Sequence, residues 1–393
     1  MKSFLPLQSI YSLAILAGLS ACKHSQNSNS KVATGSASFD SGPVLFDLND
    51  VSFLLPKESG ISLATQTSEG PLVSKEIFDQ SAAMLIRTRS AFPGYDAFKA
   101  VGVRIDNCAK LLPQQPCQPQ IRLVFQAGDN AIHMIFNIEK AKALAMYQDF
   151  YDLKKAGLPM TTKGNLGLHP IIGKESMKGP FSDRFKNLVL KYALPSRYDR
   201  IAIMGSGNSG APWEFAASQA IVNGKINQTQ IPCQEPGELT NTMTAGIISG
   251  VHQVPPMTGC DDFNLEEVTY FPMMGGHIKP YGNNPGTIAA VKTVNPELTF
   301  FGSTTCVNCH MALRTGIPAP VAAGLQTFAK HVAYQSPTDV TQGKPTTEGG
   351  RWPSRAFGYG EENRGVEINL FTINDTMRVA HELNELIRSG EIK

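Results

Sequence analysis

Apolar and polar positions follow two different periods along the middle of the chain. Apolar residues that recur every three or four positions predict helices; these cover residues 76–89, 139–155 and 183–192. Short apolar runs bounded by turn residues predict strands; these cover residues 121–126, 131–138, 200–204 and 268–271. Because the two types do not alternate regularly, the pattern predicts an α+β fold and not a doubly wound sheet.

The clearest local unit is a hairpin. Residues 213–221 and 225–231 have strand character and are separated by Asn223 and Gly224. Asn-Gly tolerates the positive φ angles that a two-residue hairpin turn requires. Residues 336–363 are polar and rich in Gly and Pro, which predicts a long loop. A final helix is expected after it, with Asn374 or Asp375 as its N-cap.

The first 22 residues resemble a bacterial lipoprotein signal peptide. A basic residue, Lys2, precedes a short apolar run over 10–19, which is too short to span a bilayer, and then the lipobox Leu19-Ser20-Ala21-Cys22. The resemblance implies that Cys22 becomes the lipidated N-terminus, which anchors the protein in a membrane. Lys23 in place of Asp favours the outer membrane. An ordinary secreted protein with a coincidental cysteine is the alternative.

Composition indicates how the chain is divided into domains and gives no sign of a nucleic-acid partner. With 42% hydrophobic and 17% charged residues the chain is globular, and a net charge of +2 carries no nucleic-acid signal. Residues 23–42 are rich in Ser, Asn and Gly, which predicts a flexible tether. We expect a large mixed α+β domain over 43–290 and a small, mostly helical segment over 291–393.

The strongest chemical signal is the run Cys306-Val307-Asn308-Cys309-His310. Two thiols on one turn can each form a thioether to a porphyrin vinyl group, and the adjacent imidazole can then bind the iron. This motif resembles the haem-attachment site of c-type cytochromes. The resemblance implies one covalent haem c held by Cys306 and Cys309, with His310 as the proximal iron ligand and a cytochrome-c-like fold for the last segment.

Other readings of Cys306 and Cys309 stay open. A thioredoxin-like redox pair would need a preceding strand and a βαβ setting, whereas residues 295–302 are broken by Pro and Gly. A zinc site would need a second ligand pair, which the sequence lacks. A chance match is the third reading.

The second haem ligand is less clearly marked. The resemblance implies a methionine some tens of residues after the motif, and Met377 lies at about that separation. His277, in a Met- and Gly-rich stretch before the motif, is the other candidate for the distal position. His331 and His381 are further alternatives.

The remaining cysteines fall into two local pairs. Of the seven cysteines, Cys22, Cys306 and Cys309 are accounted for above, and the other four form two pairs that are close in sequence, Cys108 with Cys117 and Cys233 with Cys260. In an oxidising periplasm an even remainder predicts two disulfides. Four free buried thiols, or other pairings, are the alternatives.

Together these features predict an exported, lipid-anchored, periplasm-facing protein that transfers single electrons through one haem iron. The sequence does not identify the redox partner protein. A surface lipoprotein that binds a ligand or partner, with Cys306 and Cys309 as a disulfide or metal pair, is the alternative. A haem or hydrolytic enzyme is a third, which no convergent acid/base set in the sequence supports.

Overall fold

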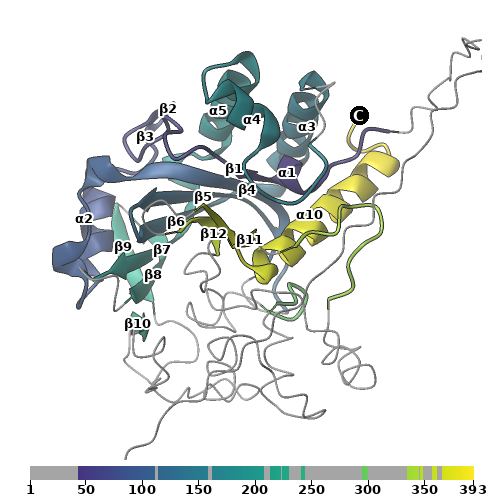
Figure 1. Cartoon of the computed structure of the whole chain (residues 1–393). Helices are drawn as coiled ribbons and strands as arrows, with labels where there is room; N and C mark the ends of the chain where they lie inside the picture. The colour runs from purple at the N-terminus through teal and green to yellow at the C-terminus, as the bar shows by residue number, and fades with distance from the viewer. Residues whose placement is uncertain are drawn as a thin grey trace, which may run out of the picture. The chain divides into compact units, whose positions relative to one another are not determined.

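An antiparallel sheet forms the centre of the fold (Figure 1). Its strands lie in the order β1 (Ser52–Leu54), β4 (Lys99–Ala109), β5 (Gln118–Ala127), β6 (Asn130–Asn137), β7 (Tyr198–Ser206), β8 (Trp213–Val222) and β10 (Thr240–Met243). β9 (Lys225–Thr229) pairs with another part of β8. The fold is therefore α+β, as predicted.

The computed structural model describes part of the chain. The described ranges are 43–110, 114–157, 162–207, 213–222, 224–229, 240–243, 294–299, 334–344, 346–347, 356–360 and 365–393. Residues 43–393 belong to one compact unit.

Side-chain alternation gives the sheet an apolar and a polar face. On β4, Val103 and Ile105 are buried, whereas Arg104 and Asp106 make ion pairs on the opposite face. The register continues the pattern, because Arg104 lies opposite Arg122 of β5. Successive side chains of a strand point to opposite faces, so this alternation separates a hydrophobic layer from a charged one.

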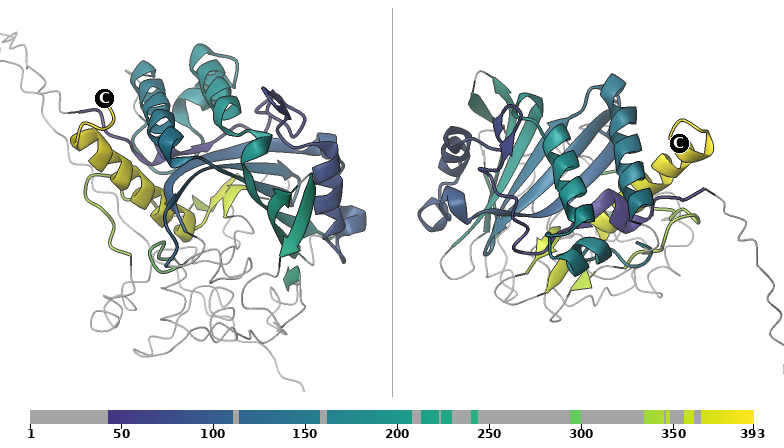
Figure 2. Two further views of the ribbon diagram at one scale, coloured as in Figure 1. Left: turned by 180° about the vertical axis from the view of Figure 1, so that it is seen from behind. Right: turned by 90° about the horizontal axis from the view of Figure 1, so that it is seen from above.

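Helices cover the apolar face (Figure 2). These are α3 (Lys140–Ala156), α4 (Pro170–Glu175) and α5 (Pro180–Tyr192). Phe53 of β1 shows the packing, since its ring centroid lies 5.7 Å from that of Phe150 on α3 and 4.7 Å from that of Phe185 on α5. All three rings are buried, which gives this layer a large apolar area.

Smaller elements complete the unit. They are α1 (Leu48–Val51), α2 (Lys75–Ala83), the pair β2 (Gln66–Thr67) and β3 (Gly70–Pro71), and three single 3₁₀ turns at Arg89–Ala91, Tyr95–Ala97 and Pro195–Arg197. A second sheet has the order β11 (Thr346–Thr347), β13 (Val366–Ile368) and β12 (Phe357–Tyr359). None of the helices within the described ranges is long and apolar enough to cross a membrane.

β12 packs against the polar face of the main sheet at Gly102. A Cβ atom at Gly102 would lie 2.6 Å from the Phe357 ring, so only glycine allows this close approach. Gln126 of β5 fixes the strand further along, since its amide nitrogen donates to the Tyr359 carbonyl at 2.6 Å and its oxygen accepts from the Tyr359 backbone N–H at 3.1 Å.

The C-terminal helix α10 (Leu370–Arg388) is capped by Asn369, whose side chain accepts from the Thr372 backbone N–H. The expected caps, Asn374 and Asp375, lie inside the helix instead. Asn374 donates to the Val294 carbonyl at 2.7 Å, and Asp375 makes ion pairs. Their side chains therefore hold tertiary contacts, which a capping rule cannot anticipate.

Five charged residues join α10 to the polar face, and we call them the ionic cluster: Arg104, Asp106, Arg122, Asp375 and Arg378. Asp375 pairs with Arg104 and Arg378, both at 2.8 Å. Asp106 pairs with Arg122 at 2.6 Å and Arg378 at 3.0 Å. All five side chains are at most 12% exposed. The two carboxylates balance two of the three guanidinium charges, and Glu382, which pairs with Arg378 at 2.9 Å, supplies a third negative charge.

The electrostatics of Asp375 follow from these neighbours. Burial raises the pKa of its carboxyl, but the positive charges of Arg378, Arg104 and Arg122 outweigh burial and hold the pKa well below its usual range. Asp375 is therefore ionised at neutral pH and serves as a permanent partner for the guanidiniums.

Most predicted elements are confirmed, with corrections at their bounds. The helices at 139–155 and 183–192, the strands at 121–126, 131–138 and 200–204, and the hairpin around Gly224 (φ +72°) are present. The helix expected over 76–89 ends at Ala83, and the loop expected over 336–363 contains β11 and β12. The expected strand at 268–271 lies outside the described residues.

Helix α10 shares one hydrophobic core with the main sheet. Thr376 on α10 bonds to Ser52 of β1 through their hydroxyls at 2.8 Å, and the helix supplies two members of the ionic cluster. α10 also contributes Ile373, Met377 and Leu383 to the same hydrophobic core as β4. The helix is part of the sheet's own structure.

The ionic cluster makes a stability prediction. Asp375→Asn removes one charge and leaves the buried guanidinium of Arg104 without its carboxylate partner, so we expect a loss of about 3–5 kcal/mol in the free energy of unfolding. Asp79→Asn is the control, because its pair with Lys75 is exposed and contributes less than about 1 kcal/mol. Urea unfolding followed by circular dichroism measures both, and equal losses would contradict the assignment.

Candidate functional site

Many of the residues with a predicted functional or disulfide role lie outside the described part of the chain. These are the haem-attachment residues Cys306, Cys309 and His310, the distal candidate His277, the lipid-bearing Cys22 and the pair Cys233 and Cys260. Their predicted roles stay predictions.

The disulfide pair Cys108 and Cys117 and the haem-ligand candidates Met377 and His381 lie within the described residues. Cys108 and Cys117 form a disulfide, as expected, with their Cα atoms 4.3 Å apart. It joins the end of β4 to the segment that leads into β5. Met377, the other distal candidate, lies on α10 with 2% of its surface exposed and belongs to the hydrophobic core.

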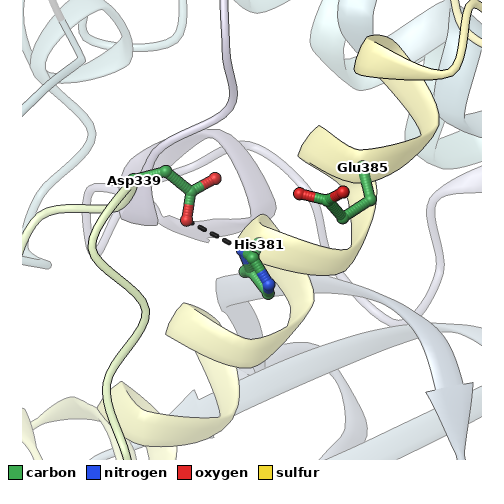
Figure 3. Close-up of side chains that lie close together, drawn as sticks. All are labelled: Asp339, His381 and Glu385. Atoms are coloured by element: carbon green, nitrogen blue, oxygen red, sulfur yellow. Dashed lines mark hydrogen bonds and ion pairs between the residues drawn. The ribbon is translucent and has the colours of Figure 1, made fainter.

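A group of possible ligand atoms lies at the C-terminal end of α10 (Figure 3). Asp339, His381 and Glu385 each offer one ligand atom, and these atoms all lie within 4.8 Å of one another. His381 and Glu385 are separated by one helical turn, so they share a face of α10. Asp339 comes from the segment 334–344, which runs beside the helix. We call these three residues the acid–histidine group.

Asn384 explains why Asp339 is held beside the helix. Its side-chain nitrogen donates to Asp339 Oδ2 at 3.2 Å and to the Phe46 carbonyl at 3.1 Å, while its oxygen accepts from the Phe46 backbone N–H at 2.7 Å. Asn384 is fully buried. One amide therefore ties three segments that are far apart in sequence.

The carboxylate of Asp339 has three side-chain partners. Its oxygens interact with His381 Nδ1 at 2.8 Å and Arg388 at 2.7 Å, besides Asn384. Burial raises the pKa of Asp339, but the hydrogen bonds from Arg388, His381 and Asn384 prevail and lower it. Asp339 is therefore an anion at neutral pH and accepts these bonds.

Arg388 also contacts the second carboxylate of the group. Its guanidinium pairs with Glu385 as well as with Asp339. Hydrogen bonding to Asp339 raises the pKa of Arg388, and Glu385 adds to this effect. A positive charge is thus held between the two carboxylates.

This geometry defines the chemistry that His381 can perform. In one neutral tautomer Nδ1 donates to the ionised Asp339 and the lone pair of Nε2 can accept a proton; in the other tautomer the lone pair is on Nδ1, where an ion could bind to His381 and Asp339 together. The His381 side chain is 41% exposed, so solutes can reach it. From the sequence, His381 was expected only as an alternative haem ligand; the spacing His381-x-x-x-Glu385, which places two ligand side chains on one helix face, is the signal that could have found this group.

His169 is a contrasting histidine, buried completely in the core. Its ring stacks between Phe53 and Phe181, with centroids 5.1 and 5.2 Å away. Nδ1 accepts from the Ile172 backbone N–H at 3.3 Å and caps α4. Burial, with a contribution from the charge of Lys154, lowers the pKa of His169 to about 3. His169 is therefore a neutral packing residue.

Comparison with known proteins adds no functional assignment. No protein-family model, curated protein or solved structure matches the chain significantly.

His169 predicts a pH dependence of stability. Histidine in an unfolded chain titrates near pH 6.5, so between that pH and about pH 3 the unfolded state binds more protons than the folded state. Stability should fall as the pH is lowered through this window, by at most about 5 kcal/mol from this group. His169→Gln keeps an acceptor for Ile172 and should show a shallower dependence in urea unfolding; identical slopes would contradict the prediction.

Proposed function

We propose that the protein is an exported, lipid-anchored c-type haem protein that transfers single electrons. The observation that carries the proposal is the motif Cys306-Val307-Asn308-Cys309-His310. Its donor set fits haem c, because two thiols supply the thioethers and an imidazole supplies the proximal ligand. Haem, when bound, supplies an iron that cycles between ferric and ferrous states.

The disulfide supports the location that this function requires. Disulfides form and persist in oxidising compartments, such as the bacterial periplasm, and are rare in the cytosol. Cys108 and Cys117 form such a bond within the α+β unit. This agrees with the lipobox ending at Cys22, and c-type haem is attached in bacteria outside the cytoplasmic membrane. Two independent features therefore support export.

The distal ligand is proposed as Met377 or His277. A methionine would raise the reduction potential relative to a second histidine. Because the Met377 side chain is only 2% exposed, ligation through Met377 would require the haem to reach the core beside α10. The last segment would then share this core while carrying a cytochrome-c-like haem environment.

A pyridine haemochrome spectrum tests the proposal. The protein is expressed in a periplasm with c-haem maturation, and loosely bound haem is removed with acidic acetone. We expect a c-type absorbance that stays with the polypeptide. Cys306→Ser/Cys309→Ser should lose it, because no thioether can form.

Cys108→Ser/Cys117→Ser is the matched control, since it removes two cysteines that the structure places in a disulfide. The fraction of this variant that folds should still carry covalent haem. A colourless wild-type protein, or covalent haem in the Cys306/Cys309 variant, would reject the proposal. A colourless protein would instead favour a ligand- or partner-binding lipoprotein with a disulfide or metal pair in the motif.

A further inference from the structure

The acid–histidine group has the donors of a metal site. One imidazole and two carboxylates come from two separate segments, with ligand atoms within 4.8 Å of one another. Zinc bonds of about 2.0–2.2 Å place donors roughly 3–3.5 Å apart, so small side-chain rotations would close the group around an ion. His381 is 41% and Glu385 58% exposed, which leaves both free to rotate.

The group already holds a cation. Arg388 pairs with both Asp339 and Glu385, so its guanidinium stands where a metal ion would be attracted. With Arg388 present the four residues carry one net negative charge; without it the two carboxylates carry two. A divalent ion that replaced the guanidinium would meet the greater negative charge.

The side chain of Arg388 can move away from both carboxylates at a small cost in free energy. It is the last residue of α10 and its side chain is 35% exposed, so it can turn into solvent. Ion pairs of this kind contribute little because water screens them. Asp339 would stay in place, since the buried Asn384 still donates to its Oδ2.

The donor types select the class of ion. A nitrogen and two oxygens suit borderline ions such as Zn²⁺, Co²⁺, Ni²⁺ and Mn²⁺, whereas Cu⁺ prefers sulfur and Ca²⁺ prefers oxygen alone. Three protein ligands leave at least one coordination position for water or another small ligand. His381 would bind through Nδ1, the nitrogen that faces Asp339, with the ring neutral and its proton on Nε2; the ion would replace the hydrogen bond between Nδ1 and Asp339, and acid would oppose binding.

We propose that Asp339, His381 and Glu385 form a binding site for a divalent transition-metal ion, and that Arg388 competes with the ion for the two carboxylates. The site is distinct from the proposed haem motif and does not depend on it.

Zn²⁺ titration of the tag-free protein by isothermal calorimetry tests the proposal. We expect one site whose affinity falls at least about tenfold in His381→Gln and in Glu385→Gln, since each loses a direct ligand. Arg388→Gln should bind more tightly, by up to about tenfold, because the competitor is gone. Co²⁺ in place of Zn²⁺ should give visible d–d bands that His381→Gln alters.

Glu382→Gln is the matched control for charge. Glu382 lies on the same helix and pairs with Arg378, outside the acid–histidine group, so its loss should change the Zn²⁺ affinity by less than about twofold. Cys306→Ser/Cys309→Ser should keep the site, which separates it from any metal bound by the motif. The proposal is overturned if His381→Gln binds Zn²⁺ as the wild type does, if Glu382→Gln weakens binding as much as Glu385→Gln, or if Arg388→Gln fails to tighten it.

Discussion

The ionic cluster between α10 and the sheet is the interaction on which the C-terminal part of the fold depends. The polar face carries Arg104 directly opposite Arg122, a like-charge pair that would destabilise an isolated sheet. Asp375 and Asp106 compensate the two guanidiniums, and Arg378 joins both carboxylates. The sheet therefore needs the carboxylate that α10 brings, and α10 is aligned by the charges it meets.

Such a cluster determines position more than it adds stability. Removing charges from water is expensive, and well-packed apolar residues often do as well. A hydrophobic contact tolerates sliding, whereas paired charges and hydrogen bonds accept one register. The core residues Ile373, Met377 and Leu383 on the same helix supply apolar burial. Apolar burial thus holds α10 on the sheet, and the ionic cluster selects its register.

The register of α10 in turn places the candidate chemistry. Because Asp375 is held by the sheet, the helical turns that follow bring His381 and Glu385 to the side where the segment 334–344 runs. Asn384 connects that segment to Phe46 near the first strand. Met377 lies on the buried side of the same helix. One helix thus carries a core methionine that is relevant to the haem proposal and a solvent-facing donor group that is relevant to the metal proposal.

The sequence by itself determined the elements that depend on local pattern. The α3 and α5 helices, the strands β5, β6 and β7, and the hairpin at Gly224 follow from apolar spacing and turn chemistry, which act within a few residues. The motif around Cys306 is likewise read from adjacent residues. The Cys108–Cys117 bond was predictable because its partners are close in sequence.

Only the tertiary structure decided the contacts between residues that are far apart in the sequence. β4 has apolar residues on one face and charged residues on the other. The charged residues Arg104 and Asp106 pair with side chains of α10, which lies at the far end of the sequence. Asn374 and Asp375 read as caps locally, yet long-range contacts to Val294 and Arg104 place them inside the helix. Asp339 joins His381 only through folding, since no spacing rule links residues on separate segments. Local propensity is encoded in neighbouring residues, whereas charge pairing and donor clustering require the chain to fold.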